Sequence, residues 1–397
     1  MIQRTSQGFL DRLLTWYPVV VVTGPRQSGK TTLCRSTAGA RPYVNLESPV
    51  ERALWAADPV GALRRHPSGA VIDEFQRLPE LASWLQVEVD RDPTPGRWLL
   101  TGSQNLAVSA SVSQSLAGRA GQLTLLPPAL AELRRFPTHP TDLWETVYTG
   151  AYPRIHDRGI PPQVWLADYV STYVTRDARD LLRIGDLATF TRFVRLIAGR
   201  TGQELNLTSL GGDVGVSQPT ARAWLSALEA TWIGYRLPRW ARNVTSQVVK
   251  TPKLHFFDTG LVCYLLGIRE PDQLALHPLR GAIFETWVAA ELYKQRAHHG
   301  LAPDLGHFRD AKGLEADLVW SGPDQTVLVE VKSGETPNPD ALRDLVRLTE
   351  RVGGECTRVV LYGGDTTHRL PSGTLLSWRE IDDAPELAPL RKEVWTR

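Results

Sequence analysis

The sequence contains few cysteines and no long apolar run. Its three cysteines, Cys34, Cys263 and Cys356, are far apart, and their spacing fits neither a disulfide framework nor a zinc site. A membrane-spanning helix needs about 20 consecutive apolar residues, and the sequence has no such stretch. The first residues also lack the apolar core of a secretory signal. These absences predict a cytoplasmic protein with no membrane partner.

Charge is unevenly distributed along the 397 residues. The length predicts two or three domains, and contents of 42% hydrophobic and 22% charged residues are typical of soluble globular proteins. The net charge of the whole chain is only +2, whereas residues 190–253 carry nine basic and three acidic residues. This segment therefore predicts a polyanionic partner, although a solvated basic face would have the same composition.

A glycine-rich segment follows the apolar run Val19–Val22 and is the strongest motif in the sequence. Backbone N–H groups in such a loop, together with the positive end of the following helix dipole, bind phosphate. Lys30 adds a cation for the β- and γ-phosphates, and the Thr31 hydroxyl is a ligand for Mg²⁺. The motif therefore predicts ATP and Mg²⁺ as cofactors. The pattern G-x-x-x-x-G-K-[ST] and the residue after it give the predicted nucleotide-binding residues Gly24, Pro25, Arg26, Gln27, Ser28, Gly29, Lys30, Thr31 and Thr32.

Polar residues end two further apolar segments that are typical of buried parallel strands. One segment leads into Asp73 and Glu74, and the other leads into Thr101 and Ser103. The carboxyl ends of parallel strands meet at one edge of a sheet, beside the phosphate loop. We therefore expect Asp73 to bind Mg²⁺, Glu74 to polarise the attacking water, and Thr101 or Ser103 to contact the γ-phosphate.

Strands and helices alternate through residue 126, which predicts an α/β fold with a three-layer, parallel-sheet domain. The predicted elements include a helix over residues 106–116 and a strand over residues 123–126. The order of the phosphate loop, the Asp73-Glu74 pair, the segment ending at Ser103 and Gly118-Arg119 resembles that of the AAA-type ATPases.

This resemblance implies that Ser103, with Asn105 as a second candidate, is the first sensor of the γ-phosphate. It also implies that Arg119 is an arginine finger, which normally reaches the nucleotide of a neighbouring subunit. A homo-oligomer is therefore expected, with a hexamer-like ring favoured. The predicted catalytic residues are Lys30, Glu74, Ser103 and Arg119.

The middle of the chain is predicted to be helical. Ser217 is a suitable N-cap and Pro219 is tolerated in a first turn, so a helix is expected to begin there. A helical segment at 207–210 and a glycine-bearing turn at 211–216 precede it, and a strand-like segment at 233–237 follows it. This order fits a winged helix-turn-helix, for which a protein-docking role is the alternative. The predicted nucleic-acid contacts are Gln218, Thr220, Arg222 and Arg236.

The last third of the sequence contains a helix with Glu285, followed by three strand-like segments. Asp317 lies on the second segment, and Glu330 and Lys332 lie two residues apart on the third, so their side chains share a face. This arrangement resembles the restriction-endonuclease-like PD-(D/E)XK fold. The resemblance implies that Glu285, Asp317 and Glu330 bind Mg²⁺ and that Lys332 stabilises charge or positions water. Domains of this fold also grip DNA without cleaving it.

The whole chain resembles a bacterial and archaeal group of AAA-type P-loop ATPases with a C-terminal domain of unknown function. The C-terminal half carries the resemblance in Phe256, Asp258-Thr259-Gly260, Phe284-Glu285, Glu315-Ala316-Asp317 and Glu330-Val331-Lys332. The predicted domains are an ATPase core at 1–128, a helical lid or linker at 129–189, a winged-helix-like domain at 190–255 and a small PD-(D/E)XK nuclease-like α/β domain at 256–397.

Three functions are consistent with the sequence. The first is a Mg²⁺-dependent ATPase that binds and remodels DNA, branched or single-stranded, as an oligomer. The second is an ATP-gated, Mg²⁺-dependent DNA nuclease, and the third is a regulatory ATPase switch that binds a protein partner. The Asn-Lys-x-Asp pattern that reads guanine is absent, which argues against a GTPase switch, and the Asp73-Glu74 pair argues against a small-molecule kinase.

Overall fold

The computed structural model describes residues 2–103, 115–174, 186–241, 251–310, 313–322 and 325–390. Within those residues, no helix combines the length and the apolar character that crossing a membrane requires. The chain divides into two compact units. The first consists of Met1–Pro127, Ala230–Trp232 and Ala297–Gly300, and the second of Pro128–Glu229, Ile233–Arg296 and Leu301–Arg397.

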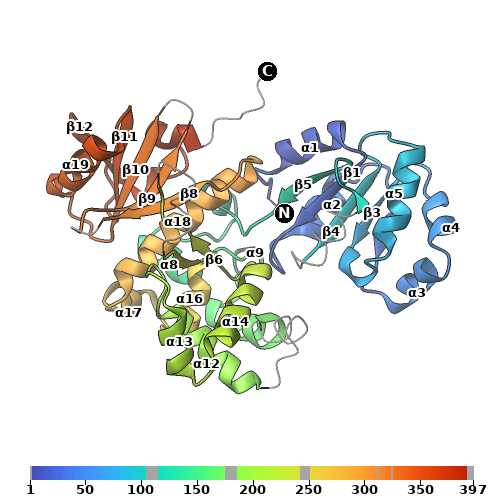
Figure 1. Cartoon of the computed structure of the whole chain (residues 1–397), viewed down its shortest axis with the longest axis horizontal. Helices are drawn as coiled ribbons and strands as arrows, with labels where there is room; N and C mark the ends of the chain where they lie inside the picture. Colours follow the sequence, from blue (N-terminus) through green and yellow to red (C-terminus); the bar gives the residue numbers. More distant parts are fainter. Residues whose placement is uncertain are drawn as a thin grey trace. The chain divides into compact units, whose positions relative to one another are not determined.

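The first unit is built on a five-stranded parallel sheet with the strand order β2-β3-β4-β1-β5 (Figure 1). The parallel α/β sheet expected from the sequence is therefore confirmed. The elements of this unit are α1 (Gln7–Trp16), β1 (Val19–Thr23), α2 (Lys30–Thr37), β2 (Tyr43–Asn45), α3 (Pro49–Ala57), α4 (Pro59–Arg64), β3 (Ala70–Asp73), the 3₁₀ turn η1 (Phe75–Arg77), α5 (Leu81–Arg91), β4 (Trp98–Gly102) and β5 (Ala120–Thr124).

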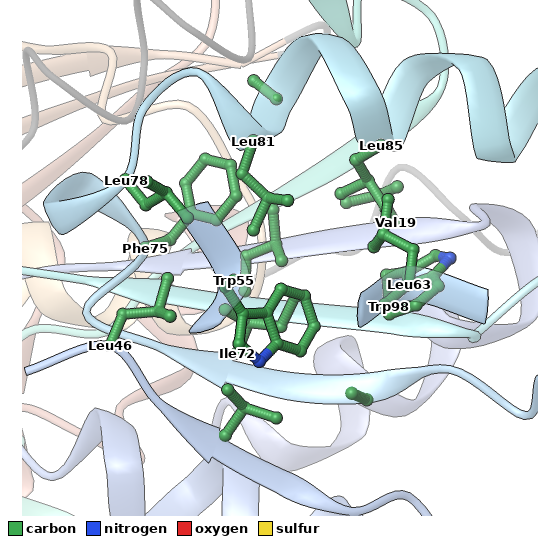
Figure 2. Packing of buried hydrophobic residues seen from close by; sticks show 14 of the residues in the cluster. Val19, Leu46, Trp55, Leu63, Ile72, Phe75, Leu78, Leu81, Leu85 and Trp98 are labelled. Carbon is green, nitrogen blue, oxygen red and sulfur yellow. The ribbon is translucent and has the colours of Figure 1, made fainter. Parts of the chain in front are cut away.

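Alternate valines of β1 face opposite sides of this sheet. Val19 and Val21 pack in a cluster with residues of α3, α4 and α5, which Figure 2 shows together with Trp98 of β4. Val20 and Val22 pack in a second cluster, with residues of α1 and α2. Because successive side chains of a strand point to opposite faces, a strand covered on both faces needs an uninterrupted apolar run. This burial fixes β1 in the sheet and places its carboxyl end at the glycine-rich loop.

Helices dominate the first part of the second unit, and two antiparallel strands, β6 and β7, lie between α14 and α16 in the sequence. Several of these helices have side-chain caps, for example Asp258, whose carboxylate accepts from the Leu261 N–H at 2.9 Å. The elements are α7 (Leu130–Leu133), α8 (Leu143–Thr149), α9 (Pro153–Arg158), α10 (Pro162–Tyr169), the π-helical turn η2 (Val170–Val174), α12 (Leu187–Ala198), α13 (Leu207–Val214), α14 (Gln218–Ala230), β6 (Gly234–Leu237), β7 (Lys253–Phe256), α16 (Thr259–Leu265) and α17 (Pro271–Ala275).

A six-stranded mixed sheet forms the rest of the second unit, with the strand order β12-β13-β11-β10-β9-β8 (Figure 1). Neighbours among β8, β9 and β10 are antiparallel, whereas β10, β11 and β13 run parallel to one another. Leu345 and Leu348 of α19 pack with apolar residues of β9, β10 and β11. The elements are α18 (Arg280–His298), β8 (Leu305–Arg309), β9 (Glu315–Ser321), β10 (Thr326–Lys332), η3 (Pro339–Ala341), α19 (Leu342–Val352), β11 (Cys356–Tyr362), β12 (His368–Leu370), β13 (Gly373–Ser377), η4 (Trp378–Glu380) and η5 (Pro385–Leu390).

The turn predicted over residues 211–216 is wrong in its first part. Helix α13 continues to Val214 and ends at Gly215, whose φ of +82° is left-handed. Gly211 lies inside this helix, and the backbone after the helix passes close to it. A side chain is disfavoured there, because a Cβ would meet the Val216 carbonyl oxygen at 2.8 Å. The glycine therefore serves close packing of the turn against the helix, and only Gly215 serves the helix end.

The strand predicted over residues 123–126 is displaced in the structure, where β5 ends at Thr124. Leu125 is buried, and its N–H still donates to the carbonyl oxygen of Thr23 at the end of β1. The apolar run in the sequence is therefore longer than the strand β5. The helix predicted over residues 106–116 lies mostly outside the described residues, as does Asn105.

Candidate functional site

The glycine-rich loop joins the end of β1 to the start of α2. Gly24 has a φ of +145°, and a Cβ at this position would lie 2.1 Å from the Leu125 carbonyl oxygen. Gly29 is the N-cap of α2 and has a left-handed φ of +97°. Both glycines of the motif are therefore required by the path of the backbone. The loop leads directly into a helix N-terminus, which favours a bound anion.

Lys30, the first residue of α2, is buried and turns back toward the loop. Its Nζ donates to the carbonyl oxygen of Gly24 at 3.0 Å and to that of Pro25 at 2.7 Å. Burial lowers the pKa of Lys30 to about 8, and the nearby carboxylates of Glu74 and Asp73 oppose this shift in part. A phosphate beside Nζ would favour the charged ammonium, so the lysine is placed to bind an anion in the loop.

Three hydroxyl groups donate to the carboxylate of Asp73, which ends β3. Thr31 and Tyr43 donate to Oδ2 at 2.9 and 2.6 Å. Thr101 donates to the other oxygen, Oδ1. The three donors come from α2, β2 and β4, so the arrangement depends on the order of the parallel strands. The structure thus brings together Thr31 and Asp73, the two residues that the sequence assigns to Mg²⁺.

Glu74 follows β3 in a left-handed conformation, with a φ of +54°. Its Oε2 lies 3.5 Å from Oγ of Ser103, just beyond the end of β4. Gln76 donates through Nε2 to the same Oε2, and this nitrogen lies 3.3 Å from Ser103 Oγ. A non-glycine residue in the left-handed region costs of order 1–3 kcal/mol, and such strain is concentrated at functional sites. The predicted water-polarising acid and the predicted sensor therefore lie side by side.

Arg4, Tyr43 and Gln76 belong to this site but carry no motif. The buried guanidinium of Arg4 donates to the carbonyl oxygens of Ser28 at 2.8 Å and Leu126 at 2.7 Å, which ties the loop to the segment after β5. Tyr43 and Gln76 carry only a positional signal, since one lies on the strand beside β3 and the other lies two residues after Glu74. Nothing local in the sequence identifies Arg4.

The residues of the loop fit ATP and Mg²⁺. The backbone at Gly24 lies so close to the Leu125 carbonyl group that no side chain fits there. Oγ of Ser28 is buried and has no hydrogen-bond partner in the described part of the chain. A hydroxyl left in this state is available to a ligand in the loop. Lys30 and the loop N–H groups would hold the phosphates, and Thr31 and Asp73 would hold the metal ion.

Arg119, the predicted arginine finger, lies directly before β5 and binds Asp90 of α5. Its Nε lies 2.5 Å from Oδ1 and its Nη2 lies 3.1 Å from Oδ2, so the contact is bidentate. The arginine side chain is still 35% exposed. A role at a neighbouring subunit's nucleotide would require the guanidinium to exchange this carboxylate for a phosphate, which its fork of donors also matches.

The predicted nucleic-acid residues lie on α14 and β6. Gln218 and Arg222 are exposed near the start of α14, and Thr220 is half-buried between them. Arg236 of β6 is bound by Glu229 of α14, through two contacts of 2.7 Å. An arginine with a bidentate carboxylate partner contributes less positive potential than its residue type suggests. Arg222 is therefore better placed than Arg236 to contact a polyanion.

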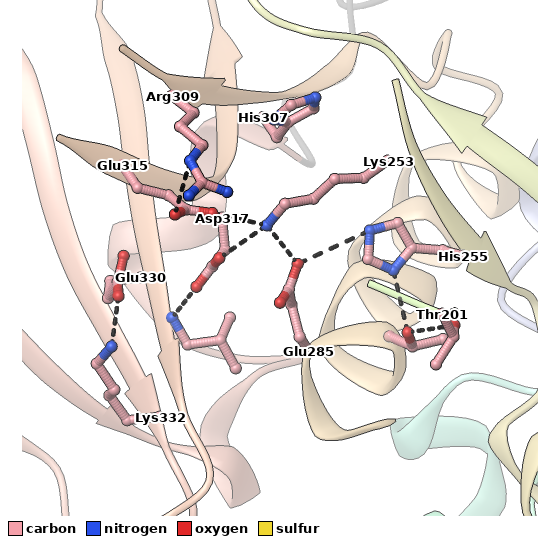
Figure 3. A network of polar contacts seen from close by, with 12 residues as sticks. Thr201, Lys253, His255, Glu285, His307, Arg309, Glu315, Asp317, Glu330 and Lys332 are labelled. Carbon is pink, nitrogen blue, oxygen red and sulfur yellow. Dashed lines mark hydrogen bonds and ion pairs between the residues drawn. The ribbon is translucent and has the colours of Figure 1, made fainter. Parts of the chain in front are cut away.

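Two of the three acids predicted to bind metal in the C-terminal part, Glu285 and Asp317, contact a lysine that no motif in the sequence indicates (Figure 3). This residue, Lys253, is the first of β7 and is buried. Glu330 does not share its ammonium group and pairs with Lys332 at 2.5 Å. Among the described residues, no group of three or more His, Cys, Asp and Glu side chains is arranged to hold a metal ion. The oxygen atoms nearest to Lys253 Nζ are Glu285 Oε1 at 2.9 Å, Glu315 Oε1 at 3.0 Å and Asp317 Oδ1 at 3.1 Å.

Burial and crowding change the charge of this cluster. Burial, followed by the charge of Asp317, raises the pKa of Glu285 to about 8 and that of Glu330 to about 7. Burial alone would lower the pKa of Lys253, but the surrounding carboxylates raise it above its ordinary value. Burial lowers the pKa of His255 to about 3, so this neighbour of Glu285 is neutral. Lys253 is therefore the buried cation that Glu285, Glu315 and Asp317 share.

Three family models match the chain. Residues 17–134 match an AAA domain, residues 140–272 match a domain of unknown function (DUF8612), and residues 280–381 match a domain of unknown function (DUF4143). The first match contains the glycine-rich loop, Asp73, Glu74 and Ser103, so the AAA-type P-loop domain expected from these residues is confirmed. Lys253 lies in the second match, and the acids around it lie in the third.

Two solved structures align with the chain at low similarity. The Walker-type ATPase PABY2304 of Pyrococcus abyssi is 15% identical, with 66% of this chain and 94% of that chain covered and a TM-score of 0.43. A variant of RuvB from Thermotoga maritima is 18% identical, with 60% of this chain and 90% of that chain covered and a TM-score of 0.33.

Two curated mycobacterial proteins are similar over nearly the whole chain. They are the uncharacterized protein Rv2008c of Mycobacterium tuberculosis (strain ATCC 25618 / H37Rv) and the uncharacterized protein Mb2031c of Mycobacterium bovis (strain ATCC BAA-935 / AF2122/97). Each is 32% identical over 403 residues, which covers 96% of this chain and 86% of the relative. The chain therefore belongs to the same family as these two proteins, and its residues 17–134 form an AAA domain of the P-loop ATPase type.

Proposed function

We propose that this chain is a Mg²⁺-dependent ATPase that acts as an oligomer and uses ATP hydrolysis to bind and remodel DNA, branched or single-stranded. One observation carries the ATPase part of the proposal. Lys30, Thr31, Asp73, Glu74 and Ser103 converge at the carboxyl edge of one parallel sheet, beside a loop that only glycine can form.

Each of these residues has a task in the proposed reaction. Lys30 and the loop N–H groups would bind the β- and γ-phosphates, and Thr31 and Asp73 would hold the metal ion that the nucleotide brings. Glu74 orients the attacking water and accepts its proton as the water oxygen bonds to the γ-phosphorus. The bond from that phosphorus to the bridging oxygen breaks, and ADP leaves. Ser103, together with Gln76, fixes the Glu74 carboxylate through the contacts at its Oε2.

The DNA part of the proposal rests on the middle of the chain. Helices α13 and α14 and the antiparallel strands β6 and β7 follow one another in the order of a winged helix-turn-helix. Gln218 and Arg222 are exposed near the start of α14, where a recognition helix of this type contacts a groove. The basic excess of residues 190–253 supports a polyanionic partner for the same part of the chain.

The test is ATP turnover by the full chain without DNA, with single-stranded DNA and with a four-way junction. We expect turnover that at least one DNA stimulates. Lys30→Ala should abolish it by preventing nucleotide binding. Glu74→Gln should lower it about 100-fold or more and leave ATP binding intact, because it removes only the proton acceptor. Glu80→Gln changes an exposed acid six residues after Glu74 in the sequence and serves as the matched control.

The outcomes separate the candidate functions. No ATP turnover under any of these conditions would contradict the ATPase. Turnover that no DNA changes would remove the DNA part of the proposal. If a protein then co-purified in a nucleotide-dependent complex, the result would support the regulatory switch. The result expected here is turnover that DNA stimulates and that Glu74→Gln lowers about 100-fold or more.

A further inference from the structure

Lys253 contacts three of the four acids in the acidic cluster formed by Glu285, Glu315, Asp317 and Glu330 (Figure 3). The residue is 4% exposed. Its Nζ has one carboxylate oxygen from α18 and two from β9 at distances between 2.9 and 3.1 Å. The cation and the acids therefore come from parts of the chain that match different family models.

The distances from Lys253 Nζ to the three carboxylate oxygens are those of ammonium hydrogen bonds and are longer than metal–oxygen bonds. Hydrogen bonds from N–H donors to oxygen are about 2.7–3.2 Å long, whereas Mg²⁺ binds oxygen at about 2.0–2.1 Å. The second oxygen of Asp317 accepts from the Val331 N–H at 2.9 Å, so this carboxylate is held on both sides. Glu330, which the sequence assigns to the metal, pairs instead with Lys332.

The other charged groups at the cluster reinforce this arrangement. Arg309 lies 3.9 Å from the second oxygen of Glu315. His255 and His307 are neutral neighbours, because burial lowers the pKa of the first to about 3 and that of the second to about 4. A metal ion entering the cluster would have to displace the Lys253 ammonium, and a buried charge that loses its partners is strongly destabilising.

We propose that the Lys253 ammonium stands where a divalent cation would bind, so that the acidic cluster is a metal-free centre that fastens β7 to β9 and α18. The nuclease-like acids then form a structural ion-pair centre, and phosphodiester hydrolysis with Mg²⁺ does not take place there. The inference is independent of the proposed ATPase function, because it concerns residues outside the AAA domain and is measured without nucleotide.

The test measures the binding of Mn²⁺ to the full chain without nucleotide. Isothermal titration calorimetry and the electron paramagnetic resonance signal of free Mn²⁺ both report this binding. Parent protein is expected to show no site that depends on the cluster. Lys253→Met removes the cation and is expected to create one Mn²⁺ site, at least tenfold tighter than any parental binding. Lys253→Met/Asp317→Asn should lose that site. Lys332→Met removes the exposed lysine of the same cluster and should not create one.

A second measurement uses the parent protein and needs no variant to fold. Fe²⁺ replaces Mg²⁺ at oxygen sites, and with ascorbate and peroxide it produces hydroxyl radicals that cut the nearby backbone. Mass spectrometry of the fragments is expected to show no cut at Glu315–Asp317 in the parent. A metal-dependent cut there would overturn the proposal, as would parental Mn²⁺ binding that Asp317→Asn abolishes. Failure of a folded Lys253→Met protein to gain Mn²⁺ would overturn it as well.

Discussion

Burial sets the charge of individual side chains in this protein. Lys30 and His255 both have a lowered pKa, to about 8 and about 3, because burial penalises the charged form. Lys253 is also buried, but the carboxylates around it outweigh that penalty and keep it charged. Lys30 can therefore bind a phosphate ligand, whereas Lys253 is already paired with carboxylates of the same chain.

Asp382 allows this effect to be tested at one residue. Its carboxylate is buried and accepts from Nε2 of Gln295 at 3.2 Å. Burial, followed by the charge of Glu291, raises the pKa of Asp382 to about 7. A carboxyl whose folded pKa exceeds its unfolded value contributes stability at low pH, and that stability is lost as the pH rises through the folded pKa. Asp382→Asn, which cannot ionise, should therefore gain stability relative to the parent as the pH rises.

The measurement is the free energy of unfolding in urea for the parent and Asp382→Asn, at about pH 5 and pH 8. The difference between the two proteins is expected to shift in favour of the variant by at most about 1.4 kcal/mol per pH unit between the unfolded and folded pKa values. Asp383→Asn alters the exposed neighbouring acid, whose charge is one of the smaller causes of the raised pKa of Asp382, and should show a clearly smaller shift. An equal difference at both pH values for Asp382→Asn would contradict the argument.

At the scale of the element, the phosphate loop depends on a backbone that leaves no space for a side chain. Gly24→Ala would place a methyl group 2.1 Å from the Leu125 carbonyl oxygen, so either the loop or the segment after β5 has to move. We expect ATP affinity to fall at least tenfold, with the helix content of the protein unchanged. Fluorescent ATP-analogue binding and circular dichroism measure the two quantities.

Gly8→Ala is the matched control for that substitution. Gly8 is an exposed residue of α1, and a Cβ at this position would meet no other atom within 4 Å. Alanine is favoured over glycine inside a helix by roughly 0.5–1 kcal/mol, so the control should be slightly more stable and should bind ATP as the parent does. Normal nucleotide binding by Gly24→Ala would contradict the proposed loop geometry.

Helix α14 and strand β6 present two arginines to the proposed DNA partner in different states. Arg222 is exposed near the start of the helix, whereas Arg236 on β6 is held by Glu229. Arg222→Ala is expected to weaken DNA binding and to reduce the slope of log affinity against log salt by about one. Arg236→Ala should have a clearly smaller effect on both. Fluorescence anisotropy over a salt series measures the DNA affinity and the salt slope. Equal effects of the two substitutions would contradict the proposal that Arg222 contacts DNA more than Arg236 does.

Elements defined by contiguous residues were predictable from the sequence, and contacts between distant residues were not. Val19–Val22 and the loop after it predict a buried strand and a phosphate site because both signals lie within a few residues. Lys253, in contrast, finds its acids 32 and 64 residues away, and Arg4 finds its carbonyl partners 24 and 122 residues away. Only the folded chain brings such groups together.

At the scale of the whole molecule, the ATP site raises the question of which cation stabilises the transferred phosphoryl group. Arg119 is the residue that the AAA resemblance assigns to this task, and within one chain it binds Asp90. A finger that acts between chains divides each catalytic site between two protomers. Head-to-tail contacts of this kind close into rings when the rotation between subunits permits it. Mixing of inactive variants tests this division of the site.

Arg119→Ala and Glu74→Gln are each expected to lower ATP turnover strongly when present alone. In a mixed assembly, a chain with an intact Glu74 can lie next to a chain with an intact Arg119, so an equal mixture should recover about one quarter of parental turnover if protomers combine at random. A mixture of Lys30→Ala and Glu74→Gln should recover none, because those two residues serve the same chain's site. Failure of the first mixture to exceed the second would show that Arg119 does not act between protomers, and full turnover by Arg119→Ala alone would remove it from the reaction.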